Sequence, residues 1–150
     1  MSIVVELYTQ NVEYYDKSLL ADIAQDVINS SGVVGATVQI IVSVAIVDES
    51  EIRKINKELR GRDEITDVIS VGEYSDNKDI SVVDNGQVFL GEVVLCYNYI
   101  EESARLNKVS VDQEFFTVYS HGILHLLGFK HGEEMFKLQD DISVKFCHNK

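Results

Sequence analysis

The stretch HGILHLLGFKH, residues 121–131, decides how this chain is interpreted. His121 and His125 are four residues apart, so on a helix their imidazoles share one face and point to one place. Gly128 can end that helix, because glycine readily adopts the left-handed conformation of a helix stop. The chain can then turn and bring His131 back to the same place. Three convergent imidazoles that leave one tetrahedral position open are typical of catalytic zinc, so the stretch predicts a metal site.

Gly122 argues against a peptidase. Zinc proteases with this histidine spacing carry glutamate directly after the first histidine, where its carboxylate takes a proton from the metal-bound water. Glycine has no group that can accept a proton. The residues therefore keep the metal site but disfavour peptide hydrolysis.

Length and composition predict one domain over residues 1–150, with 45% hydrophobic residues and room for a core. No segment is apolar for long enough to span a bilayer, and the N-terminal MSIVVELYTQ lacks the pattern of a signal peptide. Cys96 and Cys147 have no disulfide-framework spacing, so we expect free thiols in a reducing compartment. The expected location is the cytoplasm, with no membrane partner.

The charge is unevenly distributed. The net charge is −12, which disfavours broad nucleic-acid binding, and no DNA partner is expected. Five of the 13 basic residues nevertheless lie within ten positions, at Arg53, Lys54, Lys57, Arg60 and Arg62. They form either a local site for phosphates or a solvated helix face that pairs with acidic neighbours such as Glu51 and Glu58.

Hydrophobic periodicity predicts strands and helices in the order β-α-β-α-β-β-α-α-α. Asp48 and Glu51 form a helix N-cap pair, and Gly61 is the natural end of that helix. We read the polar residues 73–86 as a loop. The fold class is α+β, with a mixed sheet of about four strands packed against helices. The strands are expected at residues 3–7, 36–47, 66–71 and 87–96, and the other helices at 14–29, 97–107, 111–127 and 133–146.

Three motifs resemble the YbeY family of bacterial endoribonucleases, which are ribosomal RNA maturation factors. They are HGILHLLGFKH, LRGRDEITDVISV at residues 59–71, and FLGEVVLC at residues 89–96. The resemblance implies a single α+β domain, one zinc ion held by His121, His125 and His131, and a role in maturing the 3′ end of 16S ribosomal RNA and in ribosome quality control. It also implies that Arg60 faces the metal.

The chain departs from the family pattern at five places. Ile65 and Gly72 stand where the family usually has proline, and Val71 stands where it has phenylalanine. Glu92 replaces the usual aspartate, and Lys130 replaces the aspartate common before the third histidine. Lys130 either points outward or turns inward, where it would weaken metal binding or contact a phosphate.

Other polar residues carry weaker expectations. Asp67, within a predicted strand, is a structural acceptor or a partner that orients a ligand histidine. Glu92 needs a partner if it is buried. Cys96 or Cys147 could add a fourth ligand, and His148 is expected to be solvated. The general base, the RNA cleavage site and the oligomeric state are not predicted.

The leading hypothesis is a zinc-dependent endoribonuclease that cleaves single-stranded ribosomal RNA on small-subunit components. Metal-activated water attacks a phosphodiester while Arg60 stabilises the developing charge, and Arg53, Lys57 and Arg62 bind substrate. Nickel is accepted by the same three imidazoles. Two alternatives stay open: a non-catalytic ribosome-assembly factor with a structural metal, and a minimal zinc hydrolase or peptidase.

Overall fold

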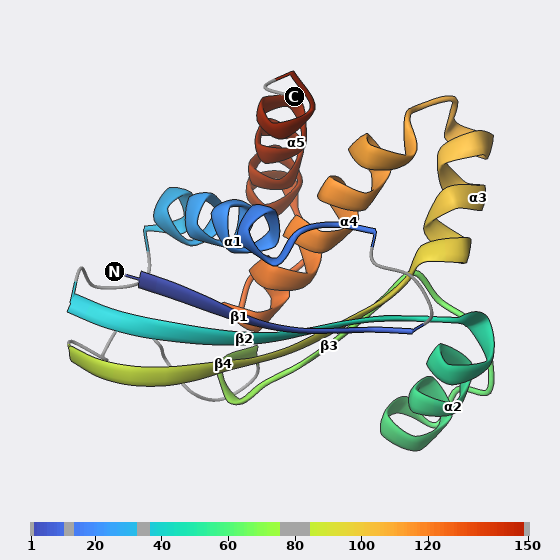
Figure 1. The fold of residues 1–150 in the computed structure, drawn as a ribbon, viewed down its shortest axis with the longest axis horizontal. Helices are drawn as coiled ribbons and strands as arrows, with labels where there is room; N and C mark the ends of the chain where they lie inside the picture. The colour runs from blue at the N-terminus through green and yellow to red at the C-terminus, as the bar shows by residue number, and fades with distance from the viewer. Residues whose placement is uncertain (1, 11–13, 33–36, 76–84, 149–150) are drawn as a thin grey trace.

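The sheet has four strands in the order β1-β2-β4-β3 (Figure 1). The computed structural model describes residues 2–10, 14–32, 37–75 and 85–148. β1 pairs in parallel with β2, β2 pairs in parallel with β4, and the short β3 pairs antiparallel with β4 at the edge. This mixed sheet confirms the predicted fold class. The strands are β1 (Ser2–Thr9), β2 (Thr37–Val47), β3 (Val68–Val71) and β4 (Asn85–Cys96).

Five α-helices surround the sheet among the described residues, in the order that the sequence predicts. Figure 1 shows α1, α4 and α5 stacked on one side of the sheet and α2 on the other. A short 3-10 turn at Glu73–Ser75 follows β3. The helices are α1 (Lys17–Ser31), α2 (Glu49–Arg60), α3 (Tyr97–Asn107), α4 (Val111–Leu126) and α5 (Glu133–His148).

The two faces of the sheet bury cores of different size. Alternating strand residues such as Val42, Val44 and Val93 pack beneath α1, α4 and α5 in the main core. The opposite residues, Ile69 and Val94 among them, form a small second core with Ile52 of α2. Most of the apolar burial therefore lies on the α4 side, and α2 rests on a much smaller contact.

A long-range hydrogen bond links α4 to the start of the chain. The Tyr119 hydroxyl donates to the carbonyl of Leu20 in α1 at 2.9 Å, with both residues fully buried. Burial raises the pKa of the Tyr119 hydroxyl, so it stays protonated and keeps donating. This contact fixes α4 against α1.

Element boundaries differ from the predicted ones by a few residues. The first helix begins at Lys17 and continues to Ser31, because Gly32 adopts the left-handed conformation (φ 70°) that ends it. β3 begins at Val68, not at residue 66. Within the predicted loop at 73–86, Glu73–Ser75 form the 3-10 turn and the last two residues belong to β4, while residues 76–84 lie outside the described residues, as does residue 36.

No helix among the described residues is both long and apolar enough to cross a membrane, as the sequence predicts. Neither Cys96, which is buried, nor Cys147 takes part in a disulfide within the part of the chain that the structure describes.

Candidate metal centre

α4 carries the first two histidines, and its C-terminal end matches the predicted stop at Gly128. Ser110 caps the N-terminus by accepting a hydrogen bond from the backbone N–H of Gln113 at 3.1 Å. After Leu126, Gly128 adopts φ 94°, and its N–H donates to the carbonyl of His125. The chain turns back here and brings His131 beside α4.

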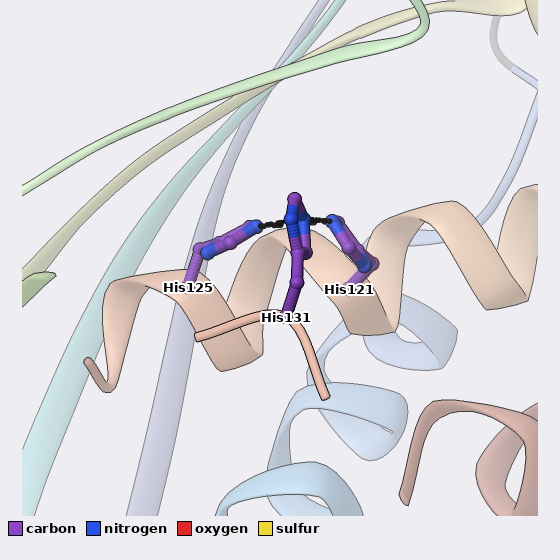
Figure 2. A group of neighbouring side chains, drawn as sticks. All are labelled: His121, His125 and His131. Carbon is purple, nitrogen blue, oxygen red and sulfur yellow. Dashed lines mark hydrogen bonds between the residues drawn. The ribbon is translucent and has the colours of Figure 1, made fainter. Parts of the chain in front are cut away.

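The three Nε2 atoms converge on one point (Figure 2). Nε2 of His121 lies 3.0 Å from that of His125, and both lie 3.2 Å from Nε2 of His131. A tetrahedral zinc ion with bonds of about 2.0–2.1 Å holds its nitrogen ligands about 3.3–3.4 Å apart. The observed spacing is therefore close to that of a zinc site.

The Nδ1 atoms of His121 and His125 show why these two rings do not simply hydrogen-bond to each other through Nε2. Nδ1 of His121 lies 2.7 Å from the amide oxygen of Gln139, and Nδ1 of His125 lies 3.2 Å from the carbonyl of Phe129. Both oxygens can only accept, so each Nδ1 carries the proton and each Nε2 presents a lone pair. Two lone pairs at 3.0 Å repel each other unless a cation lies between them. The residues present therefore fit a metal ion.

Burial adds to this preference at His125. Desolvation lowers the pKa of its imidazole, and the neighbouring His121, His131 and Arg60 lower it further. A low pKa keeps the ring neutral, which is the form that binds a metal.

Within the described residues the ligand group consists of the three histidines alone. Neither Cys96 nor Cys147 belongs to this group, so the suggestion that one of them supplies a fourth ligand is wrong. Three protein ligands leave one position for water or substrate. The side chain of His148 lies outside the described side chains.

A cleft of about 470 Å³ lies beside the histidines, and its lining comes from four parts of the fold. α2 contributes Arg60, β3 contributes Ser70, and the 3-10 turn contributes Ser75. α4 and the turn after it contribute His125, Phe129, Lys130 and His131. The arginine predicted to face the metal therefore shares a cleft with two of the histidines.

Comparison with known proteins bears directly on this site. A model of the family Endoribonuclease YbeY matches residues 5–146. The chain belongs to the YbeY family. It is 31% identical over 147 residues to Endoribonuclease YbeY of Mycoplasmopsis synoviae (strain 53), which covers 97% of this chain and 89% of that protein. It is 38% identical over 110 residues to Endoribonuclease YbeY of Macrococcus caseolyticus (strain JCSC5402), which covers 70% of this chain and 71% of that protein.

The fold agrees with this membership. The solution structure of TM1509 from Thermotoga maritima is similar, with a TM-score of 0.59 and 25% identity over 98% of this chain and 93% of that one. The predicted family and enzyme class, a metal-dependent endoribonuclease, are confirmed by the family match.

Gly122 has a packing role in this YbeY chain. A Cβ atom at this position would lie 2.9 Å from Cγ1 of Val93 and 3.2 Å from both the Ser70 hydroxyl and Cγ2 of Val68. The Ser70 hydroxyl also donates to the Gly122 carbonyl at 3.0 Å. The lack of a side chain lets α4 approach β3 and β4 closely, so the glutamate of a zinc protease would not fit here.

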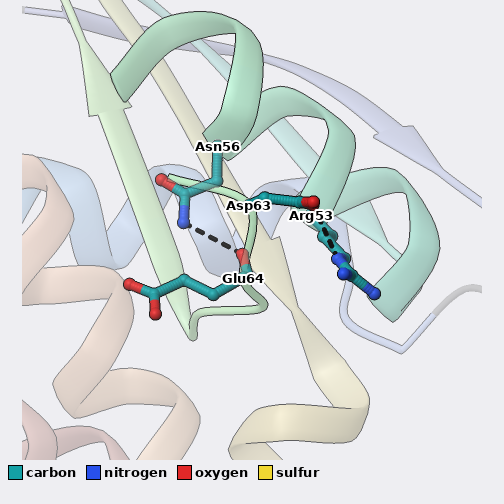
Figure 3. Close-up of polar contacts among 4 residues, drawn as sticks. All are labelled: Arg53, Asn56, Asp63 and Glu64. Atoms are coloured by element: carbon teal, nitrogen blue, oxygen red, sulfur yellow. Dashed lines mark hydrogen bonds and ion pairs between the residues drawn. The ribbon is translucent and has the colours of Figure 1, made fainter. Parts of the chain in front are cut away.

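Arg60 is the last residue of α2, and polar contacts hold both ends of this helix in place. Asp48 caps the helix by accepting from the N–H of Glu51 at 2.8 Å, and Gly61 ends it with φ 69°, as predicted. The following loop is tied back to the helix, as Figure 3 shows. Asn56 donates through Nδ2 to the carbonyl of Glu64 at 3.0 Å, and Arg53 donates through Nε to Asp63 at 2.8 Å.

The other basic residues of α2 and its loop lie elsewhere. None of Arg53, Lys57 and Arg62 lines the cleft. Arg53 pairs with Asp63 and Arg62 pairs with Glu64, so the acidic partners come from the loop and not from Glu51 or Glu58. No contact between described residues ties the Arg60 guanidinium to a carboxylate or to the carbonyls of α2.

The departures from the YbeY pattern have visible consequences. Lys130 is exposed and lines the cleft beside the histidines. Gly72 packs against β4 so closely that a Cβ would lie 2.5 Å from the Leu90 carbonyl, so the family's proline would not fit. Glu92 is exposed and needs no buried partner. Nothing in the structure explains Ile65 or Val71.

One participant was missed by sequence reasoning. The partner of His121 is Gln139 of α5, while the side chain of Asp67 accepts from the Thr66 hydroxyl at 3.3 Å. Asp67 and Gln139 both line a recess of about 230 Å³ that also includes His121. A glutamine 18 positions from its partner, on another helix, leaves no local signal, because only the docking of α5 brings the two together.

Proposed function

We propose that residues 1–150 act as a single zinc-dependent hydrolase domain that cleaves single-stranded ribosomal RNA in the bacterial cytoplasm. The proposed role is maturation of the 3′ end of 16S ribosomal RNA and ribosome quality control, on components of the small subunit. One observation carries it: three histidines direct their Nε2 atoms at one point, and two of them share a cleft with Arg60, which has no ion-pair partner among the described residues, in a chain of an endoribonuclease family.

His121, His125 and His131 would hold the metal ion. When bound there, zinc supplies Lewis acidity and brings the pKa of a bound water down toward about 7. The same three nitrogens would also bind nickel, which is the metal expected in some recombinant preparations. The exposed position of His131, with its ring stacked at 6.0 Å on that of Phe136, leaves room for substrate on that side.

Arg60 would bind the scissile phosphate and stabilise the charge that develops on its non-bridging oxygens. Its planar fork of donors suits a phosphate, and it has no carboxylate partner among the described residues to give up. Lys130 would add a second positive charge at the same cleft. Together they compensate locally for the net charge of −12.

Arg53, Lys57 and Arg62 would contact flanking nucleotides outside the cleft. To bind phosphates, Arg53 and Arg62 must first break their ion pairs with Asp63 and Glu64. Each would therefore contribute less to RNA affinity than Arg60. The cleft between α2 and the turn after α4 would suit single-stranded RNA, whose backbone can bend into it and whose bases can be splayed out.

The test is cleavage of a single-stranded RNA by the purified protein, the metal-stripped protein and the His125→Ala variant. His148→Ala is a matched control, because it removes the one histidine outside the motif. We expect cleavage by the untreated protein and by His148→Ala, with activity and stoichiometric metal both lost in His125→Ala. Full metal content in His125→Ala would refute the site assignment.

A second function is favoured by the acidic surface. A net charge of −12 suits a basic ribosomal protein better than RNA, so the chain would act as a non-catalytic assembly factor whose metal braces α4 against the following turn. Absence of RNA cleavage by protein with stoichiometric zinc would favour this function. The peptidase alternative is weakened further by the close packing around Gly122.

A further inference from the structure

The two α4 histidines are oriented by different kinds of acceptor. His125 donates from Nδ1 to a backbone carbonyl, that of Phe129, which no substitution removes. His121 donates from Nδ1 to the side chain of Gln139, a residue of a different helix. The described contacts of His131 do not include an Nδ1 partner. Gln139 is therefore the one replaceable acceptor among them.

The position of Gln139 depends on how α5 docks. Met135 and Ile142 of α5 are 0% and 5% exposed in the main core. The Ser143 hydroxyl donates to the carbonyl of Gln113 at 3.0 Å and so ties α5 to the first turns of α4. Gln139 lies between these anchors, half-buried at the recess beside His121. Its amide oxygen is thus held where Nδ1 needs an acceptor.

A neutral imidazole carries its proton on either nitrogen, and only the Nδ1–H form offers Nε2 to a metal. An acceptor fixed at Nδ1 selects that form and holds the ring at the required angle. The partner in such sites is often a carboxylate, which also makes the ring more basic. A glutamine that presents its amide oxygen, as Gln139 does, selects the same form without adding negative charge.

We propose that Gln139 is a positioning residue for the metal centre, which couples the docking of α5 to metal affinity. The inference rests on the proposed metal site. Gln139 acts through His121 and touches neither metal nor RNA. The amide oxygen, and not merely the bulk of the side chain, carries the effect.

The experiment compares zinc affinity, measured by competition with a chelator, in wild type and three variants. Gln139→Leu keeps the approximate size and removes the acceptor, and Gln139→Glu keeps an acceptor. Asp140→Asn, at the next and exposed position, is the control. We expect Gln139→Leu to lose about 10- to 100-fold in zinc affinity. Gln139→Glu should bind as tightly as wild type or more tightly, and Asp140→Asn should be unchanged.

A spectroscopic measurement separates positioning from a general packing effect. In metal-free protein at pH 8, nitrogen NMR of the histidine side chains should show His121 in the Nδ1–H form in wild type. The Gln139→Leu variant should show a mixture with the Nε2–H form, while its circular dichroism stays unchanged.

The outcomes distinguish this inference from the proposed function. Wild-type zinc affinity in Gln139→Leu would overturn the role of Gln139 and leave the metal site intact. Equal losses in Gln139→Leu and Gln139→Glu would overturn the role of the acceptor oxygen. Wild-type protein that binds no zinc would overturn the metal site itself, and this inference with it.

Discussion

α4 and α2 meet at one cleft, but they are built in opposite ways. α4 is buried along most of its length, with Phe115, Phe116 and Tyr119 fully enclosed. α2 buries only Ile52 and Asn56, and is held by a cap, a glycine stop and exposed ion pairs. Two of the three proposed metal ligands, His121 and His125, thus stand on a helix fixed by core packing, whereas Arg60 stands on one fixed by local polar contacts. Metal binding and phosphate binding should therefore be separable by mutation.

The largest effect is expected on the α4 side. Gly122→Glu forces a side chain into a contact where the Cβ alone would approach Val93 to 2.9 Å, and it buries a carboxylate without a partner. We expect a loss of about 3 kcal/mol or more in the free energy of unfolding, and no peptidase activity. Urea denaturation and a casein assay measure these, with the exposed Asn98→Glu as control. Robust casein cleavage would contradict the packing argument.

On the α2 side, the largest effect should fall on catalysis and spare the fold. Arg60→Glu reverses the charge at the cleft and should lower RNA cleavage about 100-fold or more, while metal content stays at wild type. Lys54→Glu makes the same charge change at an exposed position of α2 outside the cleft, and should retain most of the activity. Equal turnover in wild type and Arg60→Glu would remove Arg60 from the mechanism.

A matched pair of caps tests the contrast more finely. Asp48→Ala in α2 and Ser110→Ala in α4 each remove one side-chain cap and should cost about 1 kcal/mol. Amide hydrogen exchange should distinguish the two variants. Asp48→Ala should lose protection along the whole of α2, whereas Ser110→Ala should lose protection only in the first turn of α4. The same pattern in both helices would show that the small core beneath α2 holds it as firmly as the main core holds α4.

The smallest effect is expected at an exposed ion pair of α2. The hydrogen bond and charge of Arg53 lower the pKa of the Asp63 carboxyl. Because the folded-state pKa lies below the unfolded one, the contribution is present at neutral pH and is lost as the pH falls through that lowered value. Arg53→Ala should raise the pKa of Asp63 in an NMR titration and change Tm at pH 7 by no more than about 2 °C, since both groups are solvated. A larger shift would mean that the loop after α2 is a main support of the helix.

Sequence reasoning worked best where one local pattern determines the structure. The H-x3-H spacing on a helix, the stop at Gly128, the cap at Asp48 and the end at Gly61 depend on neighbouring residues alone, and all are observed. The convergence of His131 followed from the same logic. The order of strands and helices was also predicted.

It failed where partners come from distant segments. The pairing of Arg53 with Asp63 in place of Glu51 depends on how the loop after α2 folds back. The insertion of β4 between β2 and β3 is a matter of tertiary topology. The Gln139 contact depends on the packing of α5, and the reason for Gly122 appears only when α4 lies on the sheet.

The bond from Tyr119 to Leu20 has a consequence for synthesis of the chain. An inner strand of the sheet, β4, is completed only at residue 96, and the helix that closes over α1 only at residue 126. A nascent chain that lacks α4 leaves the apolar face of α1 and β2 uncovered, so stable folding must wait until most of the sequence has left the ribosome. Because the chain contains no proline, slow refolding in vitro would report this late assembly or metal capture, and not prolyl isomerisation.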